Sequence, residues 1–313
     1  MRILIPGGTG LIGRALSASL AKEGHEVILL SRAPQRARNL PPGVRAEGWD
    51  GRTAAGWGHL ADGADAIVNL AGASIAGEGF FPSRWTAARK TLLTESRLHA
   101  TQAVVEAARG AARKPAVVVQ SSAIGYYGPH ADEPLTEDAP PGDDFLARLC
   151  VAWEAAAAPL DELGVRRVTL RTGVVLSTAG GAFPRLLLPF RLFAGGPMGN
   201  GRQWMSWIHL ADEVAAIRFL LAREDAAGPF NLTAPEPLTN AQFSRLLGRI
   251  MRRPAFLPVP AFAMRLALGE AATIVLDGQR VLPRRLQELG FAFRFPTAEA
   301  ALRDLLGNAP AAG

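Results

Sequence analysis

Short apolar runs alternate with amphipathic stretches through the first half of the chain. The apolar runs lie at residues 3–5, 27–30, 66–70, 117–120 and 168–170. Helical periodicity covers residues 95–109 and 144–158. After residue 10, Ile12, Leu16 and Leu20 fall on one helical face. Continuous apolar strands that alternate with helices are typical of a parallel sheet covered on both faces. The pattern therefore predicts a doubly wound α/β fold.

The pattern changes after residue 176. Residues 177–207 are rich in glycine, proline and aromatic residues. A stretch of this length is typical of a substrate loop, and an irregular surface insertion is the alternative. Helical periodicity returns at residues 210–223 and 240–252.

These changes indicate two regions. We expect a dinucleotide-binding sheet domain over residues 1–176 and a substrate loop with a C-terminal region over residues 177–313. Some elements of residues 208–253 are expected to pack back on the sheet. A mostly helical tail, with two or three short helices, is expected at about residues 254–306.

The segment between the first apolar run and the first helix is rich in glycine. Gly7, Gly10 and Gly13 have the spacing GxxGxxG between a strand and a helix, the context of a dinucleotide-binding fingerprint. The first glycine permits a tight turn, the second lets backbone N–H groups approach a pyrophosphate, and the third lets the helix pack close to the strand. The helix N-terminus would offer the phosphates unpaired donors and the positive end of its dipole. The expected phosphate loop comprises Gly7, Thr9, Gly10, Leu11, Ile12 and Gly13. An ordinary tight turn is the alternative interpretation.

The end of the second apolar run indicates which dinucleotide binds. Ser31 and Arg32 stand where NAD sites usually carry Asp or Glu. A guanidinium can pair with a 2′-phosphate and a serine can donate a hydrogen bond to it, whereas a carboxylate would repel it. We therefore expect NADP(H) rather than NAD as the cofactor. The alternative is that Arg32 is a plain exposed arginine.

Two further segments are expected at the cofactor because ligands of such sheets bind beyond the carboxyl ends of the strands. Leu70, Ala71 and Gly72 leave the third apolar run, and small residues there would let the dinucleotide lie across the sheet edge. Arg97, near the start of the next helix, could reach a phosphate. A surface position for Arg97 is equally consistent with the sequence.

Composition and charge exclude several other classes. The net charge of +6 comes almost entirely from arginines spread along the 313 residues, with only three lysines. A nucleic-acid-binding protein would more often show a basic stripe with interleaved aromatics, so we expect no nucleic-acid partner. Cys150 is the single cysteine, which excludes an intrachain disulfide and a multi-cysteine metal site. No apolar run is long enough to span a bilayer and the chain enters a strand at once, so we expect a cytoplasmic protein without a membrane partner. The sequence is also compatible with a homodimer.

Several phrases of the sequence together resemble an extended short-chain dehydrogenase/reductase. These phrases are GGTGLIG at 7–13, NLAG at 69–72, SSAIGYYG at 121–128 and SWIHLAD at 206–212. Arg84-Trp85, Ser96-Arg97, WEAA at 153–156 and GVVLS at 173–177 resemble, more narrowly, the YfcH-like atypical epimerase family. The tail is similar to the C-terminal domain of unknown function that ends those proteins.

The resemblance implies a Rossmann-type domain, NADP(H) binding, an oxidoreductase or isomerase activity and a smaller C-terminal substrate region. It places the 2′-phosphate at Ser31 and Arg32. It also implies that Leu70, Ala71, Arg97 and the segment 172–174, with Val174, line the rest of the cofactor site.

The chain departs from the wider superfamily in its proton relay. That superfamily uses Tyr-x-x-x-Lys with a nearby serine, and the lysine lowers the pKa of the tyrosine. The only tyrosines here are Tyr126 and Tyr127, and no lysine lies four residues after either. Counting back from Glu154, the usual Tyr and Lys positions fall at about Leu146 and Cys150.

Three residues are candidates to replace that relay. Ser122 and Tyr127 could orient a carbonyl or hydroxyl, and His209 could act as acid or base, although a lone His in an apolar segment is often structural. Cys150 is a weaker candidate nucleophile. Two functions stay open. One is an NADP(H)-dependent oxidoreductase or epimerase-like enzyme with an unknown small-molecule substrate. The other is a redox-inactive NADP(H)-binding sensor or scaffold.

Overall fold

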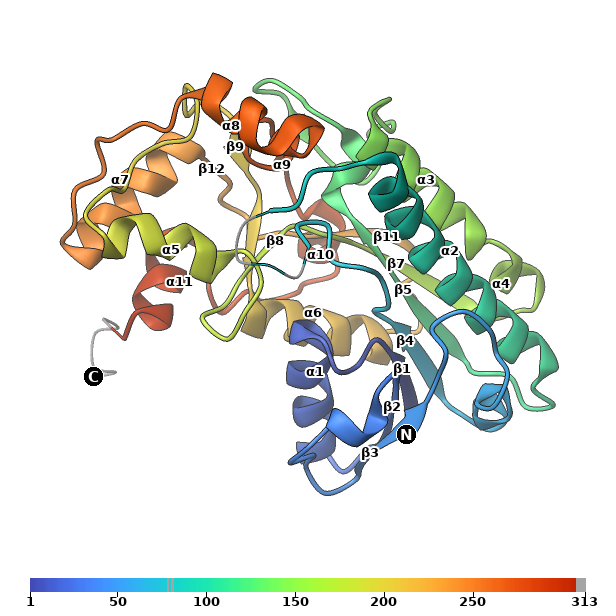
Figure 1. The fold of residues 1–313 in the computed structure, drawn as a ribbon. Coiled ribbons are helices and arrows are strands. Elements are labelled where there is room, and N and C mark those ends of the chain that lie inside the picture. Colours follow the sequence, from blue (N-terminus) through green and yellow to red (C-terminus); the bar gives the residue numbers. More distant parts are fainter. Residues whose placement is uncertain (78, 80–81, 308–313) are drawn as a thin grey trace.

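A parallel sheet and a smaller C-terminal lobe lie side by side in this protein (Figure 1). The computed structural model describes residues 1–77, 79 and 82–307. The sheet has seven strands in the order β11-β7-β5-β4-β1-β2-β3, and every neighbouring pair is parallel. The strands are β1 Arg2–Pro6, β2 Glu26–Ser31, β3 Val44–Gly48, β4 Ala66–Asn69, β5 Val117–Ala123, β7 Arg166–Thr172 and β11 Gly228–Leu232. This topology confirms the predicted doubly wound fold.

The strand order reverses between β1 and β4, which creates the switch point at which ligands of such sheets bind. Helices α1 (Leu11–Lys22) and α6 (Leu210–Ala222) cover one face of the sheet. Helices α2 (Ala87–Gly110), α3 (Phe145–Ala156) and α4 (Pro159–Glu162) cover the other. Because both faces are covered, the central strand β1 buries Ile3, Leu4 and Ile5 completely.

Two strands of the sheet were not expected from the apolar pattern. Strand β3 is a half-buried edge strand, so its residues do not form an apolar run. Strand β11 brings residues 228–232 back to the sheet beside β7. Helix α2 also begins at Ala87 rather than at residue 95, because the Thr86 side chain caps its N-terminus by accepting a hydrogen bond from the backbone N–H of Arg89.

The C-terminal lobe is built from helices and short strands. The segment 177–207 is not an irregular loop, since it contains the helix α5. The elements of the lobe are β8 Val174–Leu176, α5 Phe183–Arg191, β9 Trp204–Met205, β10 Trp207–His209, β12 Leu238–Thr239, α7 Asn240–Met251 and α11 Ala298–Leu305. Strand β8 pairs with β10, and β9 with β12. A core of Phe183, Trp207, Phe243 and Leu302 holds these elements together.

The tail contacts several parts of the molecule instead of forming one helical unit. Its further elements are α8 Ala261–Leu268, α9 Thr273–Leu276, β13 Arg280–Val281 and α10 Arg284–Glu288, so with α11 the described tail has four α-helices rather than two or three. Leu268 and Ala271 pack on Leu93 of α2 and Leu149 of α3. Strand β13 pairs with β6 (Pro134–Leu135), and α10 packs on β11.

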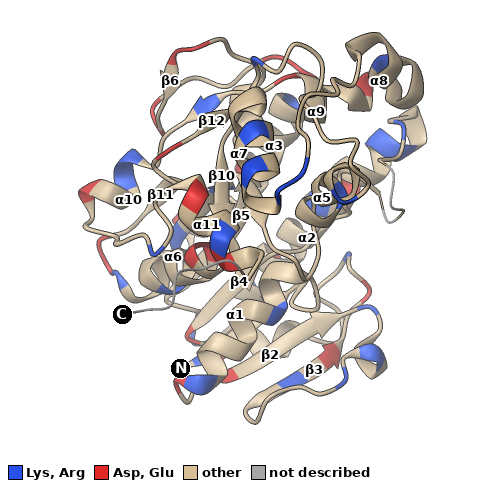
Figure 2. Cartoon of the chain, turned by 90° about the vertical axis from the view of Figure 1, so that its left-hand side faces the viewer, with Lys and Arg blue, Asp and Glu red and all other residues tan. Residues whose placement is uncertain are grey.

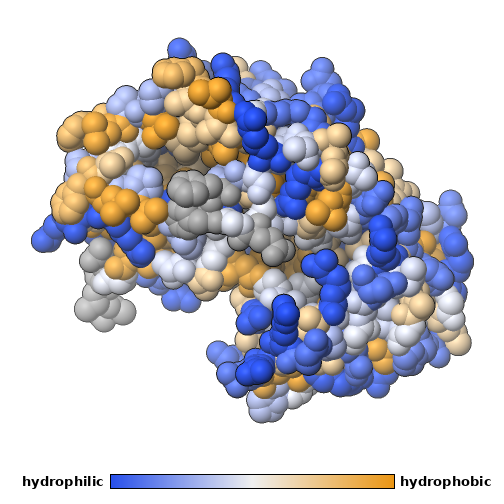
Figure 3. Space-filling view, viewed as in Figure 1, coloured by the Kyte–Doolittle hydropathy of each residue, from blue (hydrophilic) through white to orange (hydrophobic). Residues whose placement is uncertain are grey.

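The surface of the two lobes differs in character. Arginine and lysine positions are scattered along the ribbon in the view of Figure 2, without one basic stripe. The C-terminal lobe exposes Leu192, Phe193, Phe256, Phe262 and Leu266. Apolar surface is accordingly frequent at the upper left of Figure 3. In the described part of the chain, no helix combines the length and apolar character needed to cross a bilayer.

Candidate functional site

Three positions of the glycine turn between β1 and α1, namely Gly7, Gly8 and Gly13, leave no room for a Cβ, and at Gly8 it would lie 2.8 Å from the carbonyl oxygen of Ile5. Gly7 has a φ of +76°, and a Cβ there would lie 2.7 Å from the carbonyl carbon of Leu70. A Cβ on Gly13 would lie 2.5 Å from the Cα of Gly8. A Cβ on Gly10 would instead meet only the carbonyl oxygen of Gly7, at 3.3 Å, and otherwise occupy open space. The turn therefore leaves open space beside the exposed Gly10 at the N-terminus of α1, and this space is the hollow at Gly10.

The first turn of α1 can donate hydrogen bonds into this hollow. Gly10 is the N-cap, no side chain caps the helix, and no acidic residue lies in its first turn. The backbone N–H groups of Leu11, Ile12 and Gly13 therefore have no partner within the helix. Free N–H donors and the positive end of a helix dipole are what a pyrophosphate needs.

Arg97 lies on the far side of the turn from α1, under the segment that leaves β4. It is only 7% exposed, and its Nη1 donates to the carbonyl oxygen of Leu93 at 2.9 Å. Its guanidinium lies 4.9 Å from the Trp153 ring and packs against exposed Gly72, whose Cβ would be 3.3 Å from it. Burial lowers the pKa of Arg97 to about 10, with a smaller contribution from repulsion by Arg89.

No carboxylate in residues 1–77, 79 and 82–307 forms an ion pair with Arg97. A buried charge without a counter-ion is costly, and an anionic ligand would offset that cost. The arginine was predicted as a phosphate contact, but its burial was not. The hollow at Gly10, the free helix donors and the unpaired guanidinium together fit a dinucleotide pyrophosphate.

Ser31 and Arg32 lie at the carboxyl end of β2, as predicted. The Ser31 hydroxyl accepts a hydrogen bond from the backbone N–H of Ala33 at 3.2 Å, which leaves its proton available. The stem of Arg32 packs against Gly51, where a Cβ would lie 3.3 Å from its Cδ. The guanidinium of Arg32 is exposed and has no ion-pair partner among the described residues. Arg32 is therefore accessible to a 2′-phosphate, whereas Ser31 is 9% exposed and has its hydroxyl proton free to donate.

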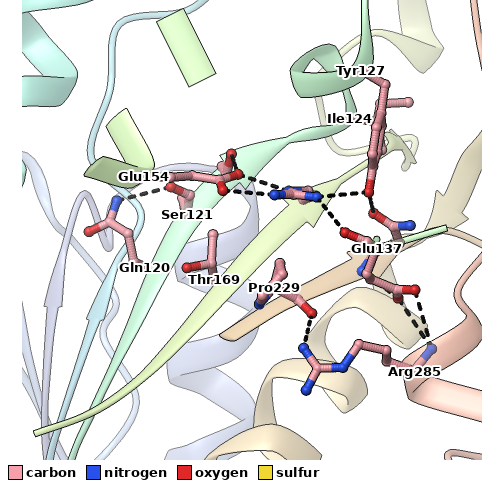
Figure 4. Close-up of polar contacts among 12 residues, drawn as sticks. Gln120, Ser121, Ile124, Tyr127, Glu137, Glu154, Thr169, Pro229 and Arg285 are labelled. Carbon is pink, nitrogen blue, oxygen red and sulfur yellow. Dashed lines mark hydrogen bonds and ion pairs between the residues drawn. The ribbon is translucent and has the colours of Figure 1, made fainter. Parts of the chain in front are cut away.

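Side chains at the end of β5 and in the turn that follows it belong to a buried polar network (Figure 4). The Ser122 hydroxyl donates to Glu154 Oε1 at 2.6 Å. Arg171 on β7 binds both oxygens of Glu154, at 2.9 and 3.0 Å, and donates to the Tyr127 hydroxyl at 3.1 Å. Its guanidinium also lies 3.4 Å from the centre of the Tyr126 ring. Ser122 and Tyr127 are thus brought together, through a carboxylate and a guanidinium that the sequence reasoning did not single out.

Tyr127 is completely buried. Its hydroxyl donates to Asn231 Oδ1 at 2.7 Å, and burial raises the pKa of Tyr127 to about 12. Asn231 in turn donates through its backbone N–H to Glu137, which also accepts from the backbone N–H of Arg285. The network therefore connects the segment after β5 to β11 and to the tail. A catalytic role for Tyr127 stays a prediction, because both hydrogen bonds of its hydroxyl are made inside the protein.

His209 lies apart from this network, at the junction of β10 and α6. Its Nδ1 accepts a hydrogen bond from the backbone N–H of Ala211, and its Nε2 lies 3.3 Å from Asp304 of α11. The ring packs 4.0 Å from that of Phe295. Burial lowers the pKa of His209, and Asp304 opposes this shift. These contacts hold the tail against α6, and no described contact joins His209 to Ser122 or Tyr127.

The two positions at which the superfamily usually has the Tyr and Lys of its proton relay lie in apolar surroundings. Leu146 packs in the cluster under α8 and α9, and Cys150 is 4% exposed. Burial raises the pKa of Cys150 to about 12, and the neighbouring Glu154 adds to the shift. The thiol is therefore protonated at neutral pH, which disfavours a nucleophilic role.

The segment from β7 to β8 contains Val174, the remaining residue predicted at the cofactor. Val174 is half-buried, and Thr172 is paired in register with Ala123 at the end of β5. The Thr172 hydroxyl donates to Glu213 Oε1 on α6 at 2.9 Å. Glu213 was not predicted from the sequence, although the acidic pair Asp212 and Glu213 among the apolar residues of α6 was a signal that could have indicated it.

Similarity to known proteins agrees with this geometry. A family model described as NAD dependent epimerase/dehydratase family matches residues 3–233, and one described as a domain of unknown function matches residues 259–305. The structure of human epimerase family protein SDR39U1 (isoform 2) with NADPH is 39% identical, has a TM-score of 0.88 and covers 98% of this chain and 100% of that chain.

Relatives from other organisms match over nearly the whole chain. Epimerase family protein SAR0825 of Staphylococcus aureus is 39% identical over 307 residues, covering 97% of this chain and 99% of the relative. An SDR39U1 homolog of Arabidopsis thaliana, described as chloroplastic, is 38% identical over 308 residues, covering 98% and 87%. The family predicted from the sequence motifs is thus confirmed, and the chain belongs to the NAD dependent epimerase/dehydratase family.

Proposed function

We propose that this protein binds NADP(H) and acts as an oxidoreductase or epimerase-like enzyme on a small-molecule substrate. The observation that carries the cofactor assignment is Arg97, a buried guanidinium without a carboxylate partner in the described chain, packed against Gly72 in the segment that leaves β4. The human relative, 39% identical, was solved with NADPH, which supports the same cofactor here.

Different residues of the site would hold different groups of the cofactor. The N–H groups of the first turn of α1 and the guanidinium of Arg97 would bind the pyrophosphate. Ser31 and Arg32 would bind the 2′-phosphate and select NADP(H) over NAD(H). Leu70, Ala71 and Val174 would line the apolar parts of the path between these groups. When bound, the nicotinamide supplies or accepts a hydride.

The network beneath this site positions the segment that follows β5. Arg171 holds Glu154 by two hydrogen bonds, and Glu154 fixes the direction of the Ser122 hydroxyl. With its proton donated to Glu154, the Ser122 oxygen can accept a hydrogen bond from a substrate hydroxyl. Ser122 would therefore orient a substrate, and Glu154 and Arg171 act through it as positioning residues.

A redox-inactive NADP(H)-binding sensor or scaffold is the second candidate. It is favoured by one observation, namely that the hydroxyl protons of both Ser122 and Tyr127 are donated to internal partners. Rapid-mixing measurement of NADPH oxidation with a panel of carbonyl compounds separates the two. Turnover with any member supports the enzyme, and saturating NADPH binding without turnover supports the sensor.

The cofactor assignment is tested by fluorescence titration with NADPH and NADH. We expect NADPH to bind at least tenfold more tightly, because a charge-assisted contact to the 2′-phosphate contributes about 1.5–3 kcal/mol. Arg32→Ala should remove most of this preference. Arg109→Ala, which removes an exposed arginine at the end of α2, is the matched control and should keep it. Equal affinities in the unaltered protein would contradict the 2′-phosphate site.

A further inference from the structure

Glu213 is a carboxyl group that the proposed site does not yet use. It lies on α6, is 1% exposed, and accepts one hydrogen bond, from the Thr172 hydroxyl to its Oε1. Its second oxygen, Oε2, is buried and has no hydrogen-bond partner in the part of the chain that the structure describes. A carboxylate in this position would lack the donors that a buried anion requires, and a neutral carboxyl group costs less to bury.

The charges around Glu213 do not compensate for its burial. Strands β5 and β8, which contact α6, carry no titratable side chain. Helix α1 contributes Arg14 and Lys22, and β10 contributes His209, but none forms an ion pair with Glu213. Burial raises the pKa of Glu213 to about 8, and the hydrogen bond from Thr172 opposes the shift. Glu213 is therefore mostly protonated at neutral pH.

The hydrogen bond from Thr172 places the Glu213 carboxyl group near the carboxyl end of β7, on the other side of the switch point from Ser31. Ser31 marks the 2′-phosphate end at β2, and the switch point lies between β1 and β4. A dinucleotide that crosses the switch point has its nicotinamide half beyond the ends of β5 and β7. Thr172 is the last residue of β7 and is paired with Ala123 of β5, so the half-buried Thr172 hydroxyl connects Glu213 to that end of the site.

We propose that Glu213 is a specificity residue for the oxidation state of the cofactor, losing its proton when NADP⁺ binds and keeping it when NADPH binds. This inference rests on the proposed function, because it requires the nicotinamide at the ends of β5 and β7. The oxidised ring carries a positive charge and the reduced ring none, and a nearby cation stabilises a buried carboxylate. The proton passes to solvent, so binding of NADP⁺ releases it and binding of NADPH does not.

The coupling of NADP⁺ binding to proton release fixes the direction in which pH changes the affinity for NADP⁺. Below the pKa of free Glu213, NADP⁺ must displace a proton, so its affinity weakens as the pH falls. The ratio of the Kd of NADP⁺ to that of NADPH should fall by up to tenfold per pH unit from pH 6 to pH 8 and level off above. Both cofactors carry the same 2′-phosphate, so titration of that group cancels in the ratio.

Titration calorimetry in buffers of different ionisation enthalpy counts the released protons. At pH 7 we expect close to one proton released with NADP⁺ and none with NADPH. Glu213→Gln should abolish both the release and the pH dependence of the affinity ratio. Asp277→Asn is the matched control, because Asp277 at the end of α9 is also a half-buried carboxyl group with a pKa raised by burial, and it should leave both intact.

Thr172→Val provides a second test should Glu213→Gln not fold. Removing the hydrogen bond that lowers the pKa of Glu213 should move the pH dependence of the ratio to higher pH. Equal proton counts for NADP⁺ and NADPH, or counts unchanged in Glu213→Gln, would overturn the inference while leaving the cofactor site in place. Failure of both NADP⁺ and NADPH to bind would instead overturn the proposed function itself.

Discussion

Replacing Arg97 by methionine should stabilise the cofactor-free protein and weaken NADPH binding. Burial lowers the pKa of Arg97 from 12.5 to about 10, and each pKa unit corresponds to about 1.4 kcal/mol, so the protonated guanidinium costs about 3 kcal/mol in the folded state. At neutral pH, Arg97 is protonated in both the folded and the unfolded chain, so the full cost applies. The lost bond to Leu93 and the lost contact with Trp153 offset about 1 kcal/mol of the gain.

Urea unfolding of the cofactor-free protein measures the first effect. We expect the free energy of unfolding to rise by about 2 kcal/mol in Arg97→Met, because methionine retains most of the apolar stem and removes the charge. Fluorescence titration measures the second effect, and we expect the Kd of NADPH to rise at least tenfold. Arg97→Lys is the matched control, since it keeps a charge in the site and should not stabilise the cofactor-free protein.

The opposite pair of results would refute the reasoning. If Arg97→Met lowers the free energy of unfolding by more than about 1 kcal/mol and leaves the Kd of NADPH unchanged, Arg97 is a structural residue. The cofactor would then be held without it, and the unpaired guanidinium would not mark a phosphate site.

Three further predictions follow from the same structure. Arg171→Met should lower the free energy of unfolding, measured in urea, by about 3–5 kcal/mol, because Glu154 is left as a buried charge. The added substitution Glu154→Leu should recover part of that loss. A loss below about 1 kcal/mol in Arg171→Met would contradict the role of the ion pair. Gly10→Ala should weaken NADPH binding in fluorescence titration with little change in Tm, because its Cβ would occupy open space. Gly13→Ala should instead lower the Tm, because its Cβ would lie 2.5 Å from backbone. Equal losses of Tm in the two variants would show that the hollow at Gly10 is not open. For Glu213 the pKa of about 8 in the folded chain lies above the value near 4.5 in the unfolded chain, so the folded chain holds an extra proton between these pH values. The free energy of unfolding therefore falls by up to about 1.4 kcal/mol per pH unit in this range. Urea unfolding of Glu213→Gln from pH 5 to pH 8 should show a shallower fall than the unaltered protein, and identical slopes in the two proteins would contradict this pKa.

The parts of the site that depend on local backbone chemistry could be predicted from the sequence. The glycine turn was predictable because Gly7 and Gly13 serve a turn and a close packing contact within a few residues of each other. Ser31 and Arg32 were predictable because the end of an apolar run fixes the end of a strand. The sheet itself followed from five apolar runs, and only its half-buried edge strand and its returning strand were missed.

The polar partners of the candidate residues could not be predicted in the same way. Ser122 reaches a carboxylate 32 residues away, and Tyr127 reaches an amide 104 residues away. Such pairs depend on how helices and strands are placed in three dimensions, which periodicity does not encode. Helix α5 was missed for a local reason, since prolines at its first turn and in its interior gave the segment the composition of a loop.

The most direct test of the cofactor assignment is the structure of this protein bound to NADPH. We expect the pyrophosphate on the first-turn N–H groups of α1 and on the guanidinium of Arg97, with the 2′-phosphate at Ser31 and Arg32. A pyrophosphate bound away from Gly10 and Arg97, or a 2′-phosphate without contact to Arg32, would contradict it.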